Sequence, residues 1–334
     1  MKGRSVWGSS EEGAVSTIRS FPRWIWWLLA ALGIVALLLV SGCLWGTLVL
    51  LGSAGRGALF PGTGPKVALI RVEGVIVSGR QGLNSLYSNV AAAETIAQQL
   101  DEAARDPSVV AVILRVDSPG GGVVPSDEIY RAVQRVRAAG KPVVASMGDL
   151  AASGGYYVSA GADYIVANPH TTTGSIGVIM TVLNLEGLYE KLGVEQEVIK
   201  SSRLKDLGSP ARPLTEEERA ILQGLVDEAY EAFIQVVAEG RHLPAQRVRE
   251  LADGRIYSGQ QAQAEGLIDE LGDISEALEA ARRLANAPQA RLVEPPGPSL
   301  LQLTLGAIRP GTVPEVRELL GLDQPVCLQY LYVP

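Results

Sequence analysis

The chain has few histidines, cysteines and lysines. Its 334 residues include only two histidines, His170 and His242, and two cysteines, Cys43 and Cys327. The cysteines are far apart, so we expect neither a disulfide framework nor a Cys/His metal cluster, and we expect no cofactor. The net charge is −7 and no long basic block is present. This charge pattern argues against nucleic acid as a partner.

Charged side chains are absent from one long stretch. Residues 24–51 form a run of 28 residues without a charge, and three tryptophans lie at its beginning. A helix of this length spans ~42 Å, more than the ~30 Å hydrocarbon core of a bilayer. We therefore expect a single transmembrane anchor. Basic residues are more frequent before the run than after it, which predicts a cytoplasmic N-terminal segment and an extracytoplasmic domain.

Two other interpretations of the apolar run remain open. A cleaved signal peptide is one, although its apolar region is usually shorter. Lipidation of Cys43 is the other, because Val40-Ser41-Gly42-Cys43 resembles a bacterial lipobox. The apolar run continues beyond Cys43, which favours the transmembrane anchor. All three interpretations deliver the following domain to the same side of the membrane.

The remaining sequence predicts an α/β domain. After residues 1–23 and the anchor, a linker rich in Gly and Pro covers 52–65, the domain covers 66–291, and a C-terminal tail covers 292–334. Hydrophobic fraction is 47%, enough for a sizeable core. Strand-like and helix-like patterns alternate, which is typical of α/β proteins with crossover connections. The ranges expected as strands are 67–72, 74–77, 109–116, 143–147 and 164–167, and those expected as helices are 90–105, 127–139, 151–160, 216–239 and 274–285.

Two glycine-rich clusters follow predicted strands. Gly120-Gly121-Gly122 comes after the strand 109–116, and Ser153 comes after the strand 143–147 at the start of a small-residue helix. Parallel α/β sheets bind ligands at the carboxyl ends of their strands. If the two strands are neighbours, backbone N–H groups near Gly120 face the Ser153 hydroxyl. A nucleophile beside oxyanion donors indicates a hydrolase.

Such a nucleophile needs a base, and the chain offers lysine more readily than histidine. Arginine cannot be deprotonated in proteins. Three of the six lysines follow Ser153: Lys191, Lys200 and Lys205. Lowering a lysine pKa from ~10.4 to ~7 costs ~4–5 kcal/mol, which burial can supply. Spacing alone does not choose among the three lysines.

Four motifs together resemble the short form of the signal peptide peptidase A family, membrane-bound serine proteases of the ClpP/crotonase fold group. They are Ser118 to Gly122, Leu150 to Tyr157 (with Leu150 where the family has Met), Thr173 to Val178, and Lys205 to Arg212. The resemblance covers residues 66–285, about two thirds of the chain. It implies repeated β-β-α units.

The resemblance also implies roles for single residues. Ser153 is then the nucleophile and Lys205 the general base; Gly120 supplies an oxyanion-hole N–H, and Ser175 orients Lys205. It further implies a ring-shaped homo-oligomer in the cell membrane, with Ser and Lys of one site coming from neighbouring protomers. The implied substrates are apolar signal peptides left in the membrane after secretory proteins are processed.

Three alternatives remain at this stage. One is another ClpP-like membrane protease that acts on protein substrates. The second is a crotonase-type acyl-CoA enzyme, which predicts no serine nucleophile and an intracellular domain. The third is a non-catalytic membrane scaffold, which predicts a degraded dyad. Asp117 and Asp149 are expected at strand ends or helix caps, and His170 in a loop.

Overall fold

The computed structural model describes residues 63–80, 89–295 and 328–332, together with Phe60 and seven residues of the N-terminal apolar run. The chain forms two units, Met1–Gly57 and Ala58–Pro334. In the first unit the described residues are exposed, and all seven are helical: Trp27, Leu32, Leu37, Leu38, Leu39, Ser41 and Gly42. Among the residues covered by this description, no helix is long and apolar enough to cross a bilayer. Most of the anchor 24–51, the linker 52–65 and the tail 292–334 lie outside it.

The second unit contains a mainly parallel sheet, with strand order β10-β7-β6-β4-β1-β11. Every pair along this path is parallel. A further strand, β8, runs parallel to the end of β6 and antiparallel to β9. The strands of this sheet are β1 (Lys66–Glu73), β4 (Val109–Ser118), β6 (Val143–Ala152), β7 (Tyr164–Ala167), β8 (Thr172–Gly174), β9 (Ile256–Ser258), β10 (Glu270–Leu271) and β11 (Arg291–Val293).

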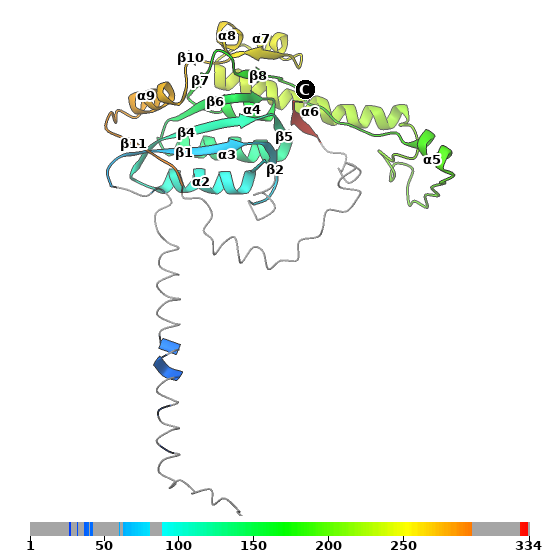
Figure 1. Ribbon diagram of the computed structural model, residues 1–334. Coiled ribbons are helices and arrows are strands. Elements are labelled where there is room, and N and C mark those ends of the chain that lie inside the picture. The colour runs from blue at the N-terminus through cyan, green and yellow to red at the C-terminus, as the bar shows by residue number, and fades with distance from the viewer. Residues whose placement is uncertain are drawn as a thin grey trace, which may run out of the picture. The chain divides into compact units, whose positions relative to one another are not determined.

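The central strands are apolar because helices cover both faces of the sheet. Val67 and Leu69 of β1 pack in one cluster with Ala277 of α9, whereas Ala68 and Ile70 belong to the larger cluster on the other face. Figure 1 shows α2 and α3 on the face opposite α9. The helices that flank this sheet are α2 (Ala93–Arg105), α3 (Val123–Ala138), α4 (Gly154–Ala160) and α9 (Ile274–Leu284).

A smaller sheet has the strand order β12-β5-β2-β3. Its strands are β2 (Val75–Val77), β3 (Val90–Ala92), β5 (Gly120–Gly122) and β12 (Gln329–Leu331). Long strands of the first sheet continue into short strands of the second and then into helices: β1 leads to β2, β3 and α2, and β4 leads to β5 and α3. The domain is therefore α/β, as the sequence predicts; β4, β5 and α3 form a strand-strand-helix unit, and the unit that begins with β1 has the additional strand β3 before its helix.

Two predicted helices begin later than the sequence suggests. Residues 90–92 form β3, because they pair with β2. Ala151 and Ala152 belong to β6, because they pair with β8, and α4 begins only at Gly154. Alanine favours a helix, but at these short boundaries pairing with a neighbouring strand overrides that local preference.

The helical region after residue 213 begins as predicted. Thr215 and Glu218 form a reciprocal capping box at the start of α6 (Glu216–Arg241). The other helices here are α5 (Glu186–Leu192), α7 (Ala245–Leu251) and α8 (Gly259–Ala264). Residues 180–214, which we call the arm, contain α5, and not one of them is buried. Figure 1 shows α5 beyond the end of α6, away from the sheets.

Candidate active site

Ser153 lies at the sharp turn between β6 and α4. Its backbone has φ 52° and ψ −115°, a conformation that residues other than glycine rarely adopt. The turn is held because the Ser153 N–H donates to the Gly174 carbonyl over 2.8 Å. Such strain costs ~1–3 kcal/mol and is concentrated at functional sites. A strained serine between strand and helix is also the geometry in which a nucleophile is presented in other hydrolases.

No described residue forms a hydrogen bond with the Ser153 hydroxyl. The residue is 1% exposed, and Oγ is the buried side-chain polar atom for which the described residues supply no partner. A buried hydroxyl without a hydrogen bond lowers the stability of the fold, so its presence here indicates a functional role. The hydroxyl is free to attack a substrate or to receive a partner from another chain.

Gly120 and Gly154 bring backbone close to the nucleophile. Gly120 has φ 98°, and a Cβ atom there would lie 2.6 Å from the Gly154 nitrogen. Only glycine allows both the conformation and this approach. The Gly120 N–H donates to the Ser118 hydroxyl over 3.0 Å, so the predicted oxyanion donor already has an acceptor in this state. Gly154 was not predicted; because it directly follows Ser153, its N–H is a second candidate donor.

Ser175 also lies near Ser153. It follows Gly174, whose carbonyl accepts the Ser153 N–H, and it has φ 49°. Its N–H donates to the Arg255 carbonyl over 2.8 Å, and the residue is 9% exposed. The structure thus brings three of the predicted site residues together: Ser153, Gly120 and Ser175.

Lys205 does not join them within one chain. It lies exposed in a turn of the arm, where its N–H donates to the Ser202 carbonyl over 3.2 Å. Since no residue in the described part of the chain pairs with the Ser153 hydroxyl, the Lys205 ammonium group forms no hydrogen bond with it. Among the described residues, Lys205 also takes part in no ion pair.

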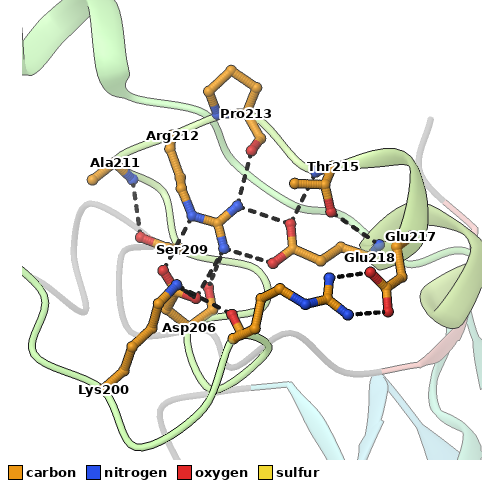
Figure 2. A network of polar contacts seen from close by, with 10 residues as sticks. Lys200, Asp206, Ser209, Ala211, Arg212, Pro213, Thr215, Glu217 and Glu218 are labelled. Atoms are coloured by element: carbon orange, nitrogen blue, oxygen red, sulfur yellow. Dashed lines mark hydrogen bonds and ion pairs between the residues drawn. The ribbon is translucent and has the colours of Figure 1, made fainter.

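A network of charges surrounds this turn (Figure 2). The Asp206 carboxylate accepts from Lys200 Nζ over 2.6 Å and pairs with Arg212 over 3.0 Å. Arg212 also pairs with Glu218 over 2.5 Å, and Glu218 caps α6 through Thr215. The guanidinium of Arg212 lowers the pKa of Glu218 to about 2 and, together with Lys200, holds the pKa of Asp206 well below its usual range. The network fixes the arm to α6.

This network separates the lysine candidates. Lys200 is committed to Asp206 and also donates to the Arg203 carbonyl over 3.1 Å. These two contacts hold the Lys200 amine within the arm. Among the described residues, no carboxylate forms an ion pair with Lys205. The arrangement therefore favours Lys205 over Lys200 as a base.

The remaining candidate residues lie in a strand, at its turn or in a loop. Asp117 accepts the Leu150 N–H over 3.1 Å and so stabilises the bend of β6, in line with the predicted strand-end role. Asp149 is exposed beside it. His170 is exposed in a loop, as predicted, and its N–H donates to Asn168 over 3.0 Å.

The strand β12 is a part of the site that the sequence did not indicate. It pairs antiparallel with β5, the Gly120–Gly122 strand beside Ser153. A short strand far along the chain, in a tail rich in Pro and Gly, has no pattern that would place it here.

Comparisons with known proteins identify relatives of this chain. Residues 135–288 match the model of peptidase family S49. Over 248 residues the chain is 42% identical to the "Putative protease slr0021" of Synechocystis sp., covering 73% of this chain and 84% of that protein. It is 41% identical over 230 residues to the "Putative signal peptide peptidase SppA" of Enterococcus faecium, and 38% identical over 230 residues to "Protease 4" of Salmonella typhi. Each match covers 69% of this chain, but only 66% and 36% of those two proteins.

Proposed function

Because the chain belongs to peptidase family S49, we propose that it is a serine endopeptidase with Ser153 as nucleophile and Lys205 as general base. The observation that carries the proposal is the strained turn of Ser153, which holds an unpaired hydroxyl beside the backbone of Gly120 and Gly154. A crotonase-type acyl-CoA enzyme needs oxyanion donors but no strained serine. A scaffold needs neither.

In the proposed reaction, neutral Lys205 accepts the Ser153 proton while Oγ attacks the peptide carbonyl carbon. We propose the backbone N–H groups of Gly154 and Gly120 as donors to the tetrahedral oxyanion, which requires the Gly120 N–H to leave the Ser118 hydroxyl to which it donates in the structure. Each donor is worth ~3–4 kcal/mol. Lys205 then gives its proton to the leaving amine. Water, deprotonated by Lys205, hydrolyses the acyl-enzyme and restores Ser153.

We further propose that the site is completed between protomers of a ring-shaped homo-oligomer. Two observations support this: no described residue of its own chain pairs with the Ser153 hydroxyl, and Lys205 lies on an arm without a single buried residue. Large apolar side chains on the arm are exposed, including Ile199 at 95%. Burial of the arm against a neighbour would remove Lys205 from water, the kind of surroundings in which a lysine can act as a base. Ser175 is proposed to orient the incoming ammonium group.

The proposed substrates are apolar signal peptides, in line with the name of the Enterococcus faecium relative. The run 24–51 is proposed to anchor the chain in the cell membrane, with the N-terminus cytoplasmic and the peptidase domain extracytoplasmic. The repeated strand-strand-helix units support assignment to the ClpP/crotonase fold group. A ClpP-like membrane protease with protein substrates is the nearest alternative.

Labelling with a fluorophosphonate tests the proposed nucleophile directly. We expect the full-length protein in detergent to gain one adduct per chain, mapped to Ser153 by peptide mass spectrometry. Ser159 serves as a matched control, because it is also buried but its hydroxyl donates to the Gly155 carbonyl over 2.8 Å. An adduct on another serine, or none in a protein that is folded and assembled, would contradict the proposal.

A further inference from the structure

Arg212 uses its whole guanidinium group in the arm. It donates to both carboxylate oxygens of Glu218, over 2.5 and 2.8 Å, and to the Asp206 carboxylate over 3.1 Å. The backbone carbonyls of Asp206 and Pro213 accept two further hydrogen bonds, over 3.3 and 3.1 Å. An arginine has five N–H donors, so every one of them has an acceptor here. Figure 2 shows the guanidinium group between the two carboxylates.

Glu218 is the fixed end of this link. Its side chain is 1% exposed and lies in the first turn of α6, whose later residues Phe233 and Val237 belong to the core. The Thr215 N–H donates to the Glu218 carboxylate over 2.9 Å, and the Glu218 N–H donates to the Thr215 hydroxyl over 3.2 Å. Separating a buried carboxylate from its cation is unfavourable. Glu218 therefore holds the Arg212 side chain at the start of α6.

Asp206 is the other end of the link, and it directly follows Lys205. Arg212 binds both the side chain and the backbone carbonyl of Asp206. Residues 200–214 contain no helix or strand, and not one of them is buried. The hydrogen bond from the Lys205 N–H to the Ser202 carbonyl fixes the shape of the turn, but not its position relative to α6. A segment with so few buried contacts depends on polar links for its position.

We propose that Arg212 is a positioning residue for the general base: by binding Glu218 and Asp206 at once, it sets where Lys205 lies relative to α6 and so relative to Ser153 of the neighbouring protomer. This inference rests on the proposed function, because it assigns a supporting residue to the proposed base. It adds a requirement that the dyad alone does not contain. A working lysine needs an intact Arg212 in its own chain.

The expected defect is in the chemical step. A catalytic group that is misplaced by ~1 Å loses ~100-fold in rate, so we expect Arg212→Gln to lose ~100-fold in kcat. KM should stay within about threefold of the wild type, because the interaction that is lost serves proton transfer and not substrate binding. Arg212→Lys keeps the charge but replaces the planar fork with one ammonium group, so its kcat should lie about tenfold below the wild type.

Arg203→Gln is the matched control. Arg203 also lies in the arm and pairs with Glu217, the residue before Glu218 in the first turn of α6. Both partners of this pair are exposed, and the described contacts of the Arg203 side chain do not include Asp206. Exposed ion pairs contribute little, so we expect kcat of Arg203→Gln within about threefold of the wild type.

Mixed oligomers show whether Arg212 acts on the lysine of its own chain. When Ser153→Ala chains assemble with Lys205→Ala chains, every working site takes its lysine from a Ser153→Ala chain. Arg212→Gln placed in the Ser153→Ala chain should lower hydrolysis by the mixture ~100-fold. Placed in the Lys205→Ala chain, it should change hydrolysis by less than about threefold, because that chain supplies only the nucleophile. A general loss of folding or assembly would affect both placements alike.

The test uses full-length chains in detergent, co-expressed with two different affinity tags and purified through both. Hydrolysis of a fluorogenic apolar peptide is measured at equal protein concentration. A loss confined to the first placement supports the proposal. Equal activity in the two placements would overturn it, as would a kcat of Arg212→Gln within about threefold of that of Arg203→Gln when each variant is assembled alone.

The proposed function is tested separately in the same experiment. If the parent mixture of Ser153→Ala and Lys205→Ala chains is inactive, shared sites are rejected, and kcat of the separately assembled Arg212→Gln and Arg203→Gln proteins decides on Arg212. Fluorophosphonate labelling of the wild type tests the nucleophile independently of all these outcomes.

Discussion

Replacing Gly120 with alanine should abolish most catalysis while leaving the fold intact. The new Cβ would lie 2.0 Å from the Tyr330 carbonyl oxygen, where ordinary contact needs ~3.5 Å. The same Cβ would lie 2.6 Å from the Gly154 nitrogen, so the backbone of the proposed oxyanion site must also shift by ~1 Å, and a misplacement of that size costs ~100-fold in rate. A displaced oxyanion donor costs ~3–4 kcal/mol, or 10²- to 10³-fold in kcat. We expect a loss in kcat of ~10²- to 10³-fold.

Gly140→Ala is the control for backbone strain alone. Gly140 has φ 77°, yet a Cβ atom there would meet no atom within 4 Å. In both variants an alanine with a left-handed backbone conformation lowers the free energy of unfolding by ~1–2 kcal/mol, which lowers Tm by a few degrees. Hydrolysis of a fluorogenic peptide and thermal unfolding are measured for both. The argument is refuted if Gly120→Ala retains kcat within about threefold of Gly140→Ala.

Three further results are expected. Ser153→Gly should have a Tm about 2 °C above that of Ser153→Ala, because both variants lack the hydroxyl but only glycine relieves the strained backbone of the turn. An equal or lower Tm would show that the turn is not strained. Mixed oligomers of Ser153→Ala and Lys205→Ala chains should recover hydrolysis, and no recovery in verified mixed rings would reject shared sites. Asp206 and Glu218 have lowered pKa values in the fold, so their stabilisation is complete above their ordinary pKa and is lost as pH falls toward about 2. Amide hydrogen exchange in the arm, corrected for intrinsic rates, should therefore become faster below pH 4 in the wild type. In Arg212→Gln the acceleration should be much smaller, because the ion pairs of Arg212 are already lost. An equal acceleration in both proteins would contradict the stabilisation of the arm by these ion pairs.

The sequence predicts the sheet because its central strands are continuous apolar runs. Residues 109–116 and 143–147 are largely buried on both faces. Their apolar runs can be recognised in the sequence without knowing which strands lie beside them. The capping box of Thr215 and Glu218 is local, so it was also predictable. Short strands such as β3 depend on pairing with β2, which no local pattern encodes.

The site was predictable only in part, for similar reasons. Ser153 and Gly120 lie in glycine-rich turns after strands, which composition reveals. The contact between β12 and Gly120 joins segments about 200 residues apart, and no periodicity in the tail points to it. The choice between Lys200 and Lys205 depends on the ion pair with Asp206, and that pair exists only in the folded arm.

The central claim is that Ser153 and Lys205 form the catalytic dyad. Its most direct test is kcat for peptide hydrolysis by the full-length protein in detergent, measured beside Ser153→Ala, Lys205→Ala and Lys200→Ala, with folding and assembly verified for each. We predict that the first two variants lose at least ~10³-fold in kcat, while Lys200→Ala stays within about tenfold of the wild type. Full activity in Ser153→Ala, or activity in Lys205→Ala equal to that of the wild type, would contradict the account.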